Sequence, residues 1–207
     1  DAKEQSILVT TFPIYQIVRQ VTKGCDGLKV SLMLPSRLGC PHDYMLRPQD
    51  MQNLVKADIL IINGLGMEDF LEKFIRKADS QIAVIDSSSG IEDTLEYTRE
   101  HLFKAADAKN GHTHHHAGVN PHLFVSPRMS AKLAMNIAMN LTSALSKNDA
   151  DAGSVYLENA RAYAQAMDKL ADEMTELAKR LKNKRIVQSH SAFDYLARDM
   201  GLEIVAV

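Results

Sequence analysis

Histidine is the residue type in this sequence whose placement suggests chemistry. Three of the eight histidines lie outside the histidine-rich segment in a similar setting, namely His42 in CPHDY, His122 in NPH and His190 in QSHSAFDY. Imidazole nitrogen suits a borderline-soft divalent ion, and zinc favours four nitrogen or sulfur ligands in a tetrahedron. Three histidines would leave one position open for a water or a carboxylate. The three are candidate metal ligands, although a loop histidine is often only a solvated surface residue.

A histidine cluster in GHTHHHAG is the second such feature, and it comprises His112, His114, His115 and His116. A purification tag is disfavoured, because the cluster is internal and Thr113 interrupts it. A metal-gathering flap and a merely solvated loop remain open.

The elements that would position these side chains follow a βα pattern. Short, nearly continuous apolar runs predict strands buried on both faces of a parallel sheet, and proline is well suited to the first helical position. Strands are expected at 7–12, 28–34, 58–63, 82–86, 185–189 and 203–207, and helices beginning at Pro13, Pro48 and Pro127. Further helices are expected over 65–78 and 192–200, and residues 87–120 are expected to form a long polar connection.

Residues 149–183 predict one long helix, because apolar residues recur there every three or four positions without a proline. At ~1.5 Å per residue such a helix extends on the order of 50 Å, which suits a link between two lobes. The predicted organisation is an N-terminal α/β lobe at 1–148, a linking helix at 149–183 and the start of a C-terminal α/β lobe at 184–207. Two strands and one helix do not bury a core of their own, so the second lobe is expected to be incomplete.

The three separate histidines lie at or near predicted strand-to-helix connections. Ligands of open α/β sheets bind outside the carboxyl ends of the strands, so the imidazoles could converge there although they are far apart in the sequence.

The overall charge and hydropathy exclude several classes of partner. Lysine and arginine total 24 against 26 acidic residues, a formal net charge of −2, so no nucleic acid or anionic membrane is expected as a partner. No run approaches the ~18 to 20 apolar residues of a membrane span, and DAKEQS lacks the features of a signal peptide. The chain is therefore expected to be cytosolic or already processed.

The two cysteines, Cys25 and Cys40, flank the predicted strand at 28–34. They could form a disulfide in an oxidising compartment or remain free thiols.

Three segments resemble the metal-specific solute-binding proteins of bacterial ABC importers, the ZnuA/TroA type. They begin CPHDYMLRPQDMQNLVKADILIINGLG, NPHLFVSPRMSAKLAMNIAMNL and RIVQSHSAFDYLARDMGLEIVAV, and they occur in the family's order. The resemblance implies two α/β lobes joined by a rigid helix, with metal held in the cleft by His42, His122 and His190. It also implies an acidic fourth ligand further along the C-terminal lobe, beyond Val207.

The implied function is an extracytoplasmic receptor that captures Zn²⁺ and passes it to a membrane permease, without catalysis. The implied protein is a monomer that lies in the periplasm or is anchored to the outer face of a membrane. The sequence is then expected to be that of the mature chain. The histidine cluster would be an accessory zinc-gathering loop. Pairing of Cys25 with Cys40 is favoured over zinc ligation by a Cys40 thiolate.

Two alternatives to zinc capture stay open. Manganese or iron is possible within the same class, but manganese-binding members tend to present a carboxylate at the third position, so His190 favours zinc. A zinc hydrolase would need a general base, and Asp43 and Asp194 are the acids near the proposed ligands. A structural or supporting role is the favoured interpretation of both aspartates.

Overall fold

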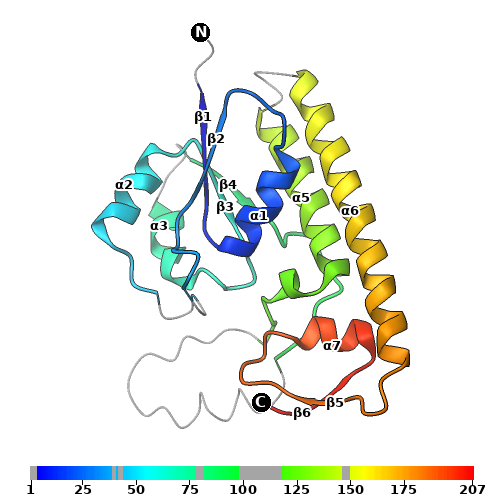
Figure 1. Ribbon diagram of the computed structural model, residues 1–207. Coiled ribbons are helices and arrows are strands. Elements are labelled where there is room, and N and C mark those ends of the chain that lie inside the picture. The colour runs from blue at the N-terminus through cyan, green and yellow to red at the C-terminus, as the bar shows by residue number, and fades with distance from the viewer. Residues whose placement is uncertain (1–3, 39–40, 42–43, 78–81, 98–117, 146–149) are drawn as a thin grey trace, which may run out of the picture.

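The computed structural model describes residues 4–38, 41, 44–77, 82–97, 118–145 and 150–207 (Figure 1). Strands and helices alternate along the first part of the chain, as the apolar runs predict. The elements are β1 (Gln5–Val9), α1 (Phe12–Val21), β2 (Leu28–Leu32), α2 (Pro48–Lys56), β3 (Ile59–Ile62), η2 (Asp69–Leu71), α3 (Glu72–Lys77), β4 (Ala83–Asp86), η3 (Leu123–Val125), α5 (Pro127–Leu145), α6 (Ala150–Lys179), β5 (Arg185–Val187), α7 (Asp194–Met200) and β6 (Glu203–Ala206).

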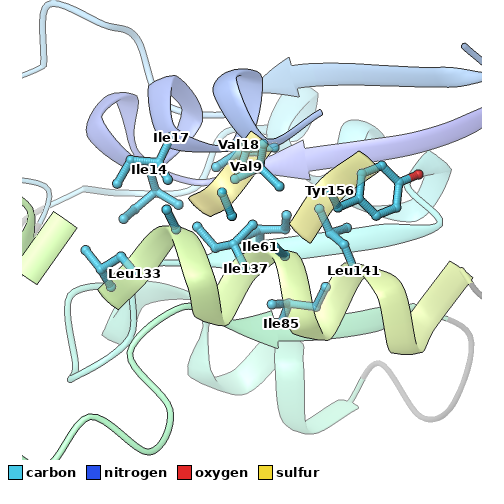
Figure 2. Close-up of a cluster of buried hydrophobic side chains, with 14 of the residues drawn as sticks. Val9, Ile14, Ile17, Val18, Ile61, Ile85, Leu133, Ile137, Leu141 and Tyr156 are labelled. Atoms are coloured by element: carbon cyan, nitrogen blue, oxygen red, sulfur yellow. The ribbon is translucent and has the colours of Figure 1, made fainter. Parts of the chain in front are cut away.

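The first four strands form one parallel sheet in the order β2-β1-β3-β4. Successive residues of β1 face opposite sides, so Ile7 and Val9 join a core beneath α1 and α5, whereas Leu8 joins a second core with Leu54 of α2. Figure 2 shows the first of these cores, in which strand and helix side chains interdigitate. Apolar side chains on both faces explain why the strands appear as continuous apolar runs in the sequence.

The end of β1 lies earlier than the sequence predicts. The strand ends at Val9 rather than Phe12, and Phe12 already opens α1 with Pro13 in the next position. Proline lacks an N–H and holds its φ near the helical value, so the chain turns into the helix just before it. Thr10 and Thr11 therefore lie directly after the strand, at the carboxyl edge of the sheet.

The single helix predicted over residues 65–78 is wrong. Gly64, Leu65 and Gly66 all have positive φ, at 88°, 53° and 80°, so the chain forms a loop before η2 and α3. Gly64 is required there, because a Cβ atom would lie 2.0 Å from Oδ1 of Asp86. The apolar periodicity came from residues of η2 and α3, which are shorter than the predicted helix.

The helix α6 lies within the predicted 149–183 segment and packs along α5 (Figure 1). Its first half also contacts α1, and further along it contacts α7. Beyond it, β5 and β6 form a separate two-stranded parallel sheet. Together with the larger sheet, this arrangement matches the predicted α/β class with a long connecting helix.

The helix α7 connects the two small strands but packs into the first lobe. Its Tyr195 is fully buried in the same core as Ile7 and Leu133. The start of the second lobe is thus attached to the first through α7.

Candidate metal centre

Two of the predicted ligands, His122 and His190, meet at the carboxyl edge of the larger sheet. His122 directly precedes η3, and His190 lies in the loop between β5 and α7. Their Nε2 atoms are 3.2 Å apart, and the ring planes cross at 85°. Two nitrogens bound at ~2.0–2.1 Å to one tetrahedral zinc ion lie about 3.3 Å apart. The two imidazoles therefore already have the spacing that a shared metal ion requires.

The two histidines line a cavity of about 280 Å³. A water needs only ~10–15 Å³ of such space, so the cavity has room for an ion and for further ligands. Most of the remaining wall is apolar, and it is formed by Phe12, Pro13, Leu34, Pro35, Leu38, Pro41, Met67, Phe124 and Ala192. A wall of this kind limits the access of water and strengthens electrostatic interactions at the nitrogens.

The third predicted ligand, His42, lies outside the described residues. Pro41, which directly precedes it in the chain, is buried and lines the same cavity as His122 and His190. Among the residues that the structure describes, no group of three or more histidine, cysteine, aspartate or glutamate side chains is placed to hold a metal ion. The structure thus brings two of the three predicted ligands together and leaves the third as a prediction.

Several other predicted residues also fall outside the described part of the chain. These are the accessory histidines His112, His114, His115 and His116, together with Cys40 and Asp43. The Cys25–Cys40 disulfide and the accessory loop accordingly stay predictions.

The side chain of Asn120 orients His122, and sequence reasoning did not single it out. Asn120 Oδ1 lies 2.8 Å from Nδ1 of the ring and accepts the backbone N–H of His122 at 3.0 Å. Because an amide oxygen only accepts, Nδ1 carries the hydrogen, and Nε2 is the nitrogen that faces His190. The NPH motif contained this residue, but its role depends on how the loop folds.

Asp194, the acid proposed as a possible general base, does not line the cavity. Its two carboxylate oxygens accept hydrogen bonds from the side-chain amides of Asn120, at 3.0 Å, and Gln188, at 2.6 Å. A general base must reach the proton that it abstracts, so this geometry favours the supporting role over the catalytic one.

A buried carboxylate, Glu68, supports the loop beside the site. It accepts hydrogen bonds from Thr10 Oγ1 at 2.6 Å and from the backbone of Asn63 at 2.7 Å, and Asn63 donates in turn to the carbonyl of Pro121. Burial raises the pKa of Glu68 to about 7, with a smaller contribution from Asp86, although the hydrogen bonds that it accepts oppose the shift. Glu68 thereby connects the end of β1 to the segment that precedes His122.

The chain that carries this site matches the model of a known protein family. The family model for "Zinc-uptake complex component A periplasmic", ZnuA, matches residues 7–207, nearly the whole chain. The chain belongs to the ZnuA family. Membership confirms the resemblance seen in the three histidine-bearing segments. A family of uptake-complex components also supports the expectation of a binding protein rather than an enzyme.

Proteins similar to this chain differ in the metal that they are named for. The chain is 29% identical over 202 residues to the high-affinity zinc uptake system protein ZnuA of Bacillus subtilis, covering 97% of this chain and 60% of that protein. It is also 29% identical over 208 residues to the iron-binding protein YfeA of Yersinia pestis, covering 99% of this chain and 60% of that protein. The chain therefore spans about three fifths of the length of these relatives.

Solved structures of ZnuA-type proteins share the fold. The Zn(II)-bound AdcA of Streptococcus pneumoniae superposes with a TM-score of 0.79 at 24% identity, covering 99% of this chain and 39% of that one. This likeness confirms the α/β fold class. Within the described residues, no helix combines the length and the apolar character that a membrane crossing requires.

Proposed function

We propose that this chain captures Zn²⁺ through His42, His122 and His190 and belongs to a receptor that delivers the ion to an ABC-type permease. The observation that carries the proposal is the 3.2 Å separation of the His122 and His190 Nε2 atoms at the wall of a cavity. Two imidazoles whose Nε2 atoms are held at this distance form a preorganised pair of ligands. A preorganised site loses less conformational entropy when the ion arrives.

The proposal includes His42 because of where its neighbour lies. Pro41 is buried in the wall that His122 and His190 share, so a ligand one residue further along has a short path to the same ion. Three nitrogen ligands favour zinc over harder ions such as manganese, which prefer oxygen. The zinc named for the Bacillus subtilis relative supports the same choice.

The remaining predicted features complete the proposed receptor. The cluster of His112, His114, His115 and His116 gathers zinc weakly near the cavity, and a Cys25–Cys40 disulfide stabilises the first lobe. The receptor acts as a monomer in the periplasm or at the outer face of a membrane, as the "periplasmic" of the family description suggests.

The test is a zinc titration of the full-length protein in competition with a chelator. Replacing His42, His122 or His190 one at a time with alanine should weaken zinc binding at least about tenfold, since each change removes one nitrogen ligand of the ion. His101→Ala removes an imidazole that is not a proposed ligand and serves as the matched control. Unchanged zinc affinity in all three ligand variants would refute the proposal.

A second candidate ion deserves a direct comparison, because the iron-binding YfeA is as similar to this chain as the zinc protein is. The affinities for Zn²⁺, Mn²⁺ and Fe²⁺ should be measured anaerobically on one preparation. We expect zinc to bind most tightly. Tighter binding of Mn²⁺ or Fe²⁺ than of Zn²⁺ would replace zinc as the cargo while leaving the proposed ligands in place.

A further inference from the structure

Asn120 belongs to the segment of His122 and contacts the segment of His190, and it is fully buried. Its Oδ1 faces the backbone N–H and the Nδ1 of His122. Its Nδ2 donates to the carbonyl of Ser191, at 2.8 Å, and to Oδ2 of Asp194, at 3.0 Å. One amide therefore contacts both sides of the proposed site.

The orientation of this amide follows from its partners. If oxygen and nitrogen were exchanged, the NH₂ group would face the backbone N–H of His122, and the oxygen would face the carbonyl of Ser191 and the carboxylate of Asp194. Every one of these contacts would then join two donors or two acceptors. The assignment of Oδ1 toward His122 is thus the one that satisfies all of the hydrogen bonds.

On its far side, Asn120 contacts a carboxylate that is itself held in place. Asp194 is 6% exposed, and its other oxygen accepts the amide of Gln188 at 2.6 Å. Gln188 in turn accepts the backbone N–H of Phe193 at 3.1 Å. Both donors to the carboxylate are neutral amides, so the negative charge polarises them in a poorly hydrated setting, and a polarised amide is a stronger acceptor at Oδ1.

We propose that Asn120 and Asp194 form a positioning pair that holds the His122 ring with Nε2 toward the cavity and keeps His122 and His190 at the spacing of one metal ion. The inference deepens the proposed function and rests on it. Neither residue touches the ion. Asn120 sets which ring nitrogen is available, and the Asp194 contact joins the loop of His122 to the loop of His190.

The first measurement needs no metal. Nitrogen-15 NMR of the imidazoles in the metal-free protein, above the pH at which histidine titrates, distinguishes the Nδ1–H from the Nε2–H form. The wild-type protein should show His122 with the hydrogen on Nδ1. Asn120→Ala should show a mixture of the two forms, because the acceptor at Nδ1 is gone.

The second measurement is zinc affinity by chelator competition on the same variants. Asn120→Ala should weaken zinc binding by roughly 10–100-fold, the range known for residues that orient a metal ligand. Asn159→Ala is the matched control, since the side-chain amide of Asn159 likewise donates two hydrogen bonds, in its case to the carbonyls of Val21 and Lys23, and Asn159 lies on α6. The control should bind zinc as the wild type does.

A pair of isosteric changes keeps the test decisive if Asn120→Ala does not fold. Asn120→Asp retains an acceptor for His122 but sets two carboxylates against each other, so zinc affinity should fall. Adding Asp194→Asn to it restores a donor and acceptor pair between positions 120 and 194, but the donor to the Ser191 carbonyl is still missing, so zinc affinity should recover in part and exceed that of Asn120→Asp alone. Recovery of this kind supports the pair, because a nonspecific loss of packing would not be repaired.

Three outcomes would overturn the positioning pair. They are an unchanged His122 tautomer in Asn120→Ala, zinc affinity within twofold of the wild type in that variant, and failure of Asp194→Asn to repair Asn120→Asp. A wild-type protein that does not bind zinc at all would instead refute the proposed function. The tautomer measurement would still decide whether Asn120 orients His122.

Discussion

The two parallel sheets of this molecule are stabilised in different ways. The four-stranded sheet is covered on both faces, and Ile7, Val9 and Ile61 in its centre are fully buried. The β5–β6 pair buries little of its own surface, and Val187 is 72% exposed. The segment that carries His190 is positioned by α7 and by polar contacts to the first lobe instead of by a core of its own. His122 therefore directly precedes a residue of the larger core, Leu123, whereas His190 depends on a few specific attachments.

Among the substitutions that test how the His190 segment is attached, Tyr195→Ala is expected to have the largest effect. Tyr195 anchors α7 in the first core, and truncating a fully buried aromatic side chain there should cost about 3–5 kcal/mol of unfolding free energy. The same change should separate His190 from His122 and weaken zinc binding. Denaturant unfolding and chelator competition measure the two effects. Loss of stability with unchanged zinc affinity would show that α7 is not what positions His190.

Glu68→Gln tests how the stability of the first lobe depends on pH. The pKa of Glu68 is raised from its usual value of 4.5 to about 7, so between these values the unfolded chain releases a proton that the folded chain retains. The stability contribution of this carboxyl is complete below pH 4.5 and is lost as pH rises to about 7, by on the order of 3 kcal/mol. Glutamine does not titrate, so the variant lacks this loss. The difference in unfolding free energy between the variant and the wild type should therefore shift in favour of the variant as the pH rises from 4.5 to 8.

Urea unfolding at several pH values measures that difference. Glu158→Gln, the same chemical change at an exposed position of α6, is the control and should unfold in parallel with the wild type across the range. Parallel curves for Glu68→Gln as well would contradict the raised pKa.

Tyr195→Phe separates the hydrogen bonds of the α7 attachment from its packing. The hydroxyl of Tyr195 donates to the carbonyl of Asn120 at 2.7 Å and accepts the N–H of Leu95 at 3.0 Å. Removing it leaves two backbone groups without this partner, which should cost about 1–3 kcal/mol, less than the alanine variant. Thermal unfolding of Tyr195→Phe beside Tyr195→Ala gives the comparison. Equal losses would assign the whole attachment to the hydroxyl.

The same contrast explains what the sequence could predict. Strands of the larger sheet were predictable because burial on both faces leaves continuous apolar runs. The meeting of His122 and His190 was expected only from the general placement of ligands outside the carboxyl ends of strands, since His190 follows the exposed strand β5 and His122 precedes η3. The role of Asn120 was not predictable, since it depends on contacts with Ser191 and Asp194, about 70 residues further along the chain. The role of Gln188 depends on how the loop between β5 and α7 folds, because its side chain contacts Phe193 and Asp194 in that loop. The loop at Gly64 was missed because apolar spacing carries no information about positive φ.

The smallest effect is expected from Val187→Ser in β5. Val187 is 72% exposed, so the substitution removes little apolar area from contact and should change the unfolding free energy of this chain by less than about 0.5 kcal/mol. Val9→Ser in β1, where the side chain is fully buried, is the matched substitution in the larger sheet. It should cost several-fold more, because it leaves a cavity and introduces a hydroxyl into an apolar core. Parallel denaturant titrations of the two variants compare the sheets directly. Similar losses would mean that β5 contributes to a core of its own, and the dependence of His190 on α7 would then be weaker than the packing indicates.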